Sequence, residues 1–158
     1  MYRLMLVFTL IVGFCVTVSS QRVLTELDLT VSGIRSGSSY RQVRKIGRPV
    51  RVRIIGYDEC ASKYRRVLYF NGLEVGLLGS KDGNRSTVIS LTVTSSKWSI
   101  APGIRIGATK ESLIRKFGPP VSESETRLDY VTKENLGLVT FQLRNGKLIR
   151  VEMMETLC

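Results

Sequence analysis

Apolar and polar residues change period several times along this chain, and each change predicts a different element. Tyr40, Val43 and Ile46 recur at helical spacing, which places their side chains on one face of a short helix near 39–46. Elsewhere apolar and polar residues alternate, as they do in half-buried strands. The same patterns predict a second helix at 109–117 and strands at 23–31, 50–57, 65–70, 73–78, 86–94, 127–132, 137–143 and 147–154.

One segment of the sequence is repeated. Residues 32–50 and 102–121 share the order Gly-Ile-Arg-x-Gly, a capping hydroxyl at Ser39 or Thr109, an apolar helical stripe, and then Gly-x-Pro. Glycine suits turns with positive φ, the hydroxyl can accept a hydrogen bond from a free helix N–H, and Gly-x-Pro ends the helix. We therefore predict an α+β fold of two tandem repeats, each a short helical segment packed on an antiparallel β-sheet. The predicted division is 1–20, a signal peptide; 21–99, the first and basic repeat; and 100–158, the second repeat.

The second copy resembles the SmpA/OmlA-type module, which occurs in small bacterial outer-membrane lipoproteins. A tandem of such modules is similar in architecture to the β-lactamase-inhibitor protein, which implies two units that form one concave antiparallel sheet backed by helices. The resemblance implies a fold rather than a ligand, because the matched positions are turn and core positions. These positions are Gly103, Ile104, Ile106, Gly107, Thr109, Leu113, Phe117, Gly118 and Pro120.

An apolar run at 4–18 follows the single charge of Arg3, as in a secretory signal peptide. The run is shorter than the roughly 20 residues of a spanning helix. We expect cleavage before Gln21 and a periplasmic or secreted location, although a retained anchor is the competing interpretation. A lipid anchor at Cys15 fits less well, because Phe14 stands where lipoprotein signals have a small residue.

Two cysteines, Cys60 and Cys158, remain after the predicted cleavage. In an oxidising compartment such a pair usually forms a disulfide bond. Closing a loop of about 100 residues would stabilise the fold by roughly 4–5 kcal/mol before strain. A bridge between two chains is the main alternative.

The sequence disfavours catalysis, because it contains no histidine. That absence removes the commonest general base and metal ligand, together with Ser-His-Asp and Cys-His arrangements. Two thiols without histidine cannot complete a zinc site. The carboxylates of Glu123, Glu125, Glu152 and Glu155 have spacings that are ordinary for exposed positions. We therefore predict no enzyme, no cofactor and no metal.

Positive charge is concentrated in the first predicted repeat. Residues 31–99 hold 13 Lys/Arg and 4 Asp/Glu, whereas residues 100–158 hold 9 and 7. Such a field attracts acidic proteins or anionic surfaces. Clustered arginine and tyrosine are also typical of protein-recognition surfaces. The candidate partner-binding residues are Arg41, Arg44, Arg51, Arg53, Tyr57, Tyr64, Arg65 and Arg66.

These features together predict an exported, non-catalytic binding protein, an inhibitor or immunity-type partner of an acidic protein. The alternative is a structural or assembly protein of the cell envelope that contacts anionic lipid or wall polymers. A third interpretation makes the basic surface a solubilising face with half-buried tyrosines. Nucleic acid is a poor match, because exported proteins rarely meet it.

Overall fold

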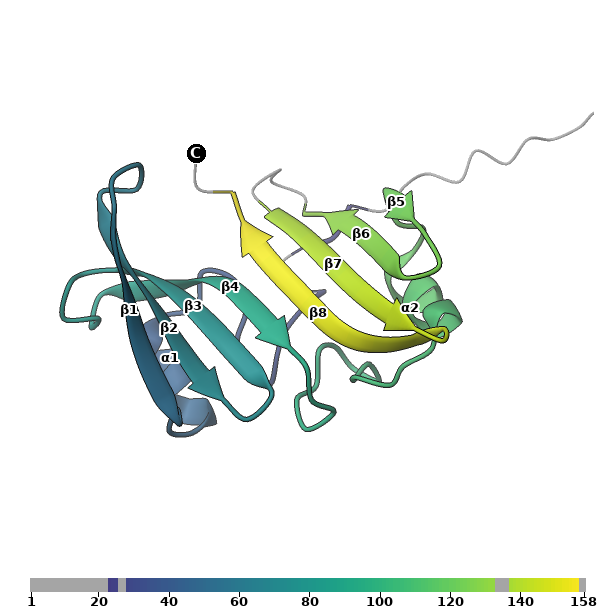
Figure 1. The fold of residues 1–158 in the computed structure, drawn as a ribbon, viewed down its shortest axis with the longest axis horizontal. Coiled ribbons are helices and arrows are strands. Elements are labelled where there is room, and N and C mark those ends of the chain that lie inside the picture. Colours follow the sequence, from purple (N-terminus) through teal and green to yellow (C-terminus); the bar gives the residue numbers. More distant parts are fainter. Residues whose placement is uncertain (1–22, 26–27, 133–136, 157–158) are drawn as a thin grey trace, which may run out of the picture.

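The structure is a computed structural model that describes residues 23–25, 28–132 and 137–156. Within these residues the chain forms two short α-helices, one 3₁₀ helix and eight strands (Figure 1). In chain order they are α1 (Tyr40–Val43), η1 (Arg44–Ile46), β1 (Arg51–Asp58), β2 (Lys63–Phe70), β3 (Leu73–Gly79), β4 (Ser86–Val93), α2 (Lys110–Phe117), β5 (Ser122–Glu123), β6 (Arg127–Val131), β7 (Gly137–Arg144) and β8 (Lys147–Glu155).

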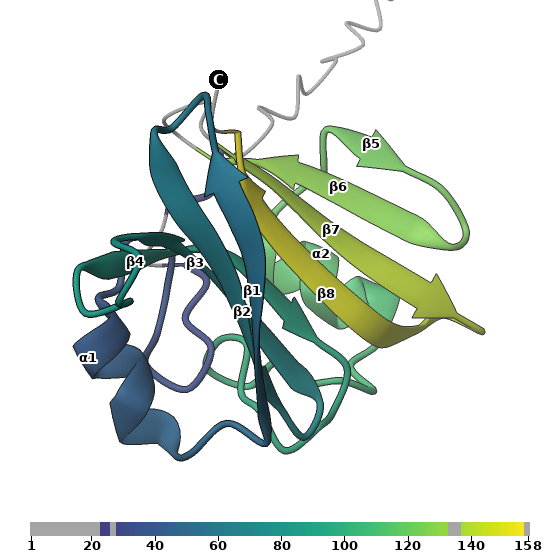
Figure 2. The ribbon, with the colours of Figure 1, turned by 60° about the vertical axis from the view of Figure 1, so that its left-hand side comes forward.

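All eight strands belong to one antiparallel sheet, in the order β1-β2-β3-β4-β8-β7-β6-β5. The prediction of two tandem repeats, each a helical segment packed on an antiparallel sheet, is therefore wrong. Its error lies at the centre of the sheet, where β4 pairs with β8 through Leu91 opposite Met153 and Val93 opposite Val151. An open strand edge presents unpaired N–H and C=O groups. Here β4 and β8 satisfy each other's groups, which joins the two halves into one sheet (Figures 1 and 2).

The two copies of the repeated segment nevertheless make matching backbone contacts. Gly37 donates its N–H to the carbonyl oxygen of Val88 in β4 at 2.9 Å, and Gly107 donates to that of Leu148 in β8 at 2.8 Å. Both glycines have positive φ, 75° and 95°, which residues with a side chain rarely adopt. The repeat thus corresponds to matching turns against the two central strands.

The helices and the described residues before α1 cover one face of the sheet and share one hydrophobic core with it (Figure 1). Val43 of α1 is fully buried there. Phe117 of α2 stacks on Phe141, with ring centroids 5.2 Å apart, and meets Tyr130 edge-on. Burial of such apolar surface is the main term that favours folding. We call this side the core face and the opposite side the outer face.

Helix α1 is shorter than the expected helix at 39–46. The side chain of Ser39 caps it together with that of Gln42, and the chain then narrows into η1 and ends at Gly47 with φ 137°. The expected strand at 23–31 is not found among its described residues, where Leu24 and Val31 form only isolated bridges. The short β5 was not predicted.

Candidate functional site

Strand β1 is an edge of the sheet and is exposed on both faces. It pairs only with β2, so one of its long sides has no partner strand among the described residues. Val50, just before the strand, is 68% exposed, Val52 is 51% exposed and Ile54 is 62% exposed. Aliphatic side chains of this size are usually buried when they lie on the core face of a sheet.

The register with β2 sorts the β1 side chains by chemistry. Val52 lies opposite Leu68, which is buried, so Val52 belongs to the core face. Arg51 and Arg53 alternate with it and point to the outer face. The guanidinium carbon of Arg51 lies 5.6 Å from the ring centroid of Tyr69, its partner across the two strands. Strand β1 thus has an aliphatic row on one face and a cationic row on the other.

A β-bulge between Ile54 and Gly56 ends this alternation. Gly56 has φ 145°, a backbone region that suits glycine. Beyond the bulge Tyr57 lies opposite Tyr64, and their rings meet edge-on with centroids 5.2 Å apart. The predicted site residues Tyr57 and Tyr64 therefore lie together, at the far end of the β1–β2 hairpin from α1.

Arg65 forms an ion pair with Asp58, which partly neutralises it. The Nε of Arg65 lies 2.5 Å from a carboxylate oxygen of Asp58. The pKa of Asp58 is below its usual value because the backbone N–H of Ala61 donates a hydrogen bond to its carboxylate, and Arg65 lowers it further. Arg65 therefore adds little free positive charge to the surface.

Arg66 is buried and serves the fold. Its guanidinium donates hydrogen bonds to the carbonyl oxygens of Lys81, at 2.7 Å, and Ser80, at 3.1 Å, in the β3–β4 turn. A Cβ added at Gly83 would meet the same guanidinium, so Gly83 leaves the room it occupies. The predicted partner-binding residue Arg66 is therefore buried, with its hydrogen bonds directed to the β3–β4 turn.

The remaining candidates, Arg41 and Arg44, are exposed on α1 and η1. Arg44 donates a hydrogen bond to the hydroxyl of Tyr40 at 3.2 Å. Helix η1 ends at Ile46 and β1 begins at Arg51, so Arg41 and Arg44 belong to the segment that leads from α1 into the edge strand (Figure 2). We define the basic edge as Arg41, Arg44, Lys45, Arg48, Arg51 and Arg53, all of them exposed. The chain between residues 29 and 57 contains 7 Lys/Arg and no Asp/Glu.

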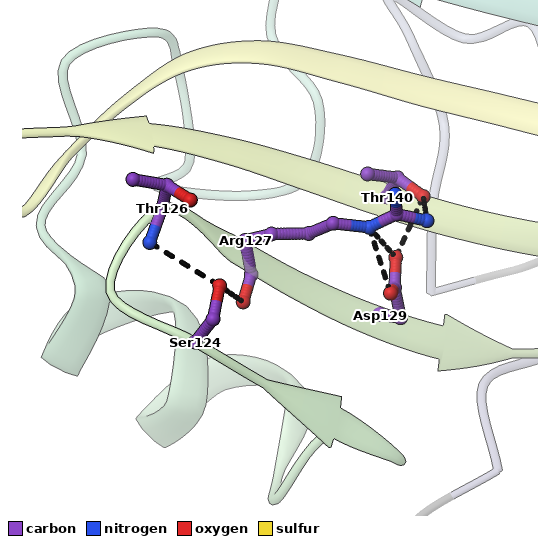
Figure 3. Close-up of polar contacts among 5 residues, drawn as sticks. All are labelled: Ser124, Thr126, Arg127, Asp129 and Thr140. Carbon is purple, nitrogen blue, oxygen red and sulfur yellow. Dashed lines mark hydrogen bonds and ion pairs between the residues drawn. The ribbon is translucent and has the colours of Figure 1, made fainter.

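A second polar cluster lies across the sheet, on β6 and β7 (Figure 3). The Nε of Arg127 donates to both carboxylate oxygens of Asp129 at 2.8 Å, and the hydroxyl of Thr140 donates to the same carboxylate at 2.7 Å. These charges compensate each other within the cluster. We interpret it as a structural contact between neighbouring strands.

A shallow cavity beside α1 is lined by Arg35, Ser36 and Gly37, with Ser38 and Gln42. Its volume is about 150 Å³. Pockets for drug-sized ligands usually measure about 300–1,000 Å³.

The described residues include no group of three or more His, Cys, Asp or Glu that could hold a metal ion. No helix within the described ranges has the length and apolar character to span a bilayer.

The sequence interpretation located the cations of β1 but missed the exposed row of Val52 and Ile54 beside them. The alternation Val-Arg-Val-Arg-Ile indicates a strand with one buried face. The pattern does not tell whether a neighbouring element covers that face. The one feature that points to an edge is Gly56, because glycine inside a strand pattern often marks a bulge and bulges gather at sheet edges.

No family model and no curated protein sequence matches this chain. Among solved structures, the chain is similar to a DUF4309 family protein, YjgB, from Bacillus subtilis, with 18% identity and a TM-score of 0.38. That match covers 75% of this chain and 79% of the other. A likeness at this level leaves the function to be argued from the residues of this chain.

Proposed function

We propose that this chain is an exported, non-catalytic binding protein that engages an acidic partner protein through the basic edge, as an inhibitor or immunity-type partner. The observation that carries the proposal is the place of Arg51 and Arg53 on an edge strand, beside exposed aliphatic side chains and with no carboxylate between residues 29 and 57. A cluster of positive charges of this kind speeds the encounter with an acidic partner and disfavours binding of basic proteins.

The charges of the basic edge suit recognition better than fold stability. Within the described part of the chain Arg53 makes no hydrogen bond and no ion pair. Even exposed ion pairs contribute only about 0–1 kcal/mol each to folding. The charges of the basic edge are therefore available to a partner, and their removal should leave the fold intact.

The test begins by cross-linking the exported chain in the cell fraction where it occurs and identifying any protein bound to it in stoichiometric amount. The affinity of that protein for purified variants of the chain is then measured. Changing Arg41, Arg44, Arg51 and Arg53 to Gln should lower the affinity at least about tenfold and flatten its salt dependence. The matched control changes Arg115, Arg144, Lys147 and Arg150 to Gln, which removes the same charge from the second half of the chain.

Wild-type affinity in the first variant would contradict the proposal. Equal losses in both variants would mean that only net charge matters. The envelope alternative predicts a different result. The wild-type chain would bind vesicles that contain anionic lipid, the variant would not, and no stoichiometric protein partner would be found. Intact mass of exported material checks the predicted cleavage before Gln21, which lies outside the described residues.

A further inference from the structure

The unpaired side of β1 combines the two properties that strand addition needs. It offers backbone N–H and C=O groups that no other described strand uses. It also presents aliphatic side chains at Val52 and Ile54 on the core face, where a neighbouring strand would cover them. We infer that an extended segment of the acidic partner adds to this edge as a ninth strand of the sheet, with acidic and aliphatic residues in alternation. This inference rests on the proposed function and specifies how the partner binds.

The alternation of β1 dictates that of its occupant. Side chains directly opposite each other on neighbouring strands lie on the same face and interact in pairs. Residues opposite Val52 and Ile54 would therefore be aliphatic, and those opposite Arg51 and Arg53 would be acidic. The guanidinium of Arg51 lies over the ring of Tyr69 on β2, the side of β1 away from the incoming strand, whereas Arg53 makes no such contact with a described residue.

A second copy of this chain is a poorer occupant. Pairing of two β1 strands would put Arg51 and Arg53 of one copy beside those of the other, on the same face. Like charges opposite each other on neighbouring strands are destabilising. A net charge of +11 also opposes self-association.

The charges of β1 do not simply protect the edge. Proteins often block an edge with an inward-pointing charge, a bulge or a very short strand. Here the inward-pointing residues of the regular part are aliphatic, and the charges point outward. The bulge comes only after Ile54, so Arg51 to Ile54 remain in regular pairing geometry. Pairing with β1 is therefore less favourable for a basic or neutral polar strand than for a strand of acidic and aliphatic residues.

The test uses two blocked synthetic peptides of one composition: Glu-Val-Glu-Val-Glu flanked by threonines, and a scrambled version with its three glutamates together. We expect the alternating peptide to bind at least about tenfold more tightly. It should also protect from hydrogen exchange those β1 amides that point away from β2, as a new strand would. Charge attraction alone would not protect them.

The outcomes separate this inference from the proposed function. Equal binding of both peptides without new β1 protection overturns strand addition and leaves the basic edge as an electrostatic surface. Absence of binding also overturns it, whereas the cross-linked natural partner still tests the proposed function. Protection of β1 that grows with protein concentration and needs no peptide would show self-pairing, which overturns it as well.

Two variants test the pairing of faces. Changing Arg51 and Arg53 to Glu should abolish binding of the glutamate peptide and create binding of the corresponding Lys-Val peptide. Changing Val52 and Ile54 to Thr, which keeps strand propensity, should weaken binding severalfold. Peptide affinity that either variant leaves unchanged would overturn the assignment of that face. Circular dichroism confirms that each variant is folded.

Discussion

Arg51 and Tyr69 face each other across β1 and β2, with the guanidinium carbon of Arg51 5.6 Å from the centroid of the Tyr69 ring. The contact anchors a cation of the edge strand to the strand that the core holds in place. Tyr69 is half-buried on the outer face. The contact restricts the rotamers of the Arg51 side chain before any partner binds.

We predict a small but measurable coupling between these two residues. In a double-mutant cycle of Arg51→Gln and Tyr69→Leu, the coupling free energy of unfolding should be about 0.5–1 kcal/mol, as for exposed cation–π pairs. Urea unfolding of the four proteins measures it. Arg53→Gln with Tyr69→Leu is the control and should give additive changes. Coupling of equal size there would show that Tyr69 responds to charge in general.

Arg66 should behave differently from the other arginines of the first half. Changing it to Gln removes charge-assisted hydrogen bonds to the carbonyl oxygens of Ser80 and Lys81. We expect the free energy of unfolding to fall by about 1.5–3 kcal/mol. The exposed Arg53→Gln should change it by less than about 0.5 kcal/mol. A loss of binding without a loss of stability in the Arg66 variant would contradict the structural role given to it.

Local features of the fold were predictable because they depend on neighbouring residues. The Asn145-Gly146 pair identifies the turn between β7 and β8, and both residues have positive φ there. Thr109 identifies the start of α2 because its hydroxyl accepts a hydrogen bond from Ser112. The β4–β8 pairing was not predictable in the same way. It joins residues about 60 positions apart, so no local pattern specifies it, and only the resemblance to tandem modules implied one joined sheet.

The same distinction between local and tertiary features applies to the residues of the candidate site. Alternation along a strand puts Arg51 and Arg53 on one face, and the register with β2 agrees. It gave Arg65 and Arg66 no separate roles, although one pairs with Asp58 and the other is buried under a turn. The burial of Arg66 depends on the β3–β4 turn, which contacts it from about 15 residues further along the chain. Side-chain burial of this kind requires the tertiary structure.

Phe117 is predicted to be a major contributor to stability. It is 1% exposed and packs on Phe141 and Tyr130. Phe117→Ala should lower the free energy of unfolding by roughly 3–5 kcal/mol, because it removes apolar contacts and leaves a cavity. Val50→Ala, at a position 68% exposed, is the control and should cost less than about 0.5 kcal/mol. A loss below about 1 kcal/mol for Phe117→Ala would mean that the core rearranges around the site.

The disulfide between Cys60 and Cys158 stays a prediction, because Cys158 lies outside the described residues. The topology supports it: Cys60 follows β1, and the antiparallel order places that end of β1 at the same end of the sheet as the end of β8 (Figures 1 and 2). Thiol labelling of denatured, unreduced monomer should find no free sulfhydryl. Full labelling, or a dimer that dissociates on reduction, would contradict an intrachain bridge. Cys158→Ser should lower stability by a few kcal/mol.

The pH dependence of stability at high pH should report on Tyr130. Burial, and to a smaller extent the charge of Glu123, raise the pKa of its phenol to about 12. The hydroxyl donates a hydrogen bond to the carbonyl oxygen of Gly118 at 2.9 Å, which requires the protonated form. In the unfolded chain the pKa of a tyrosine is about 10. The folded state therefore binds the proton more tightly than the unfolded state does.

The sign of the effect follows from that difference. Below about pH 10 the phenol is protonated in both states, so its stabilisation is fully present. As the pH rises from about 10 to about 12, the unfolded chain loses the proton first, and the free energy of unfolding should fall by an amount on the order of 2 kcal/mol. Urea unfolding at a series of pH values measures this decrease.

Tyr130→Phe should lose about 1 kcal/mol at neutral pH, because the hydrogen bond to Gly118 is gone. Its further decrease above pH 10 should be smaller by the contribution of the missing phenol, since every other titrating group is retained. Parallel curves for the two proteins over this range would show that Tyr130 ionises alike in the folded and unfolded states.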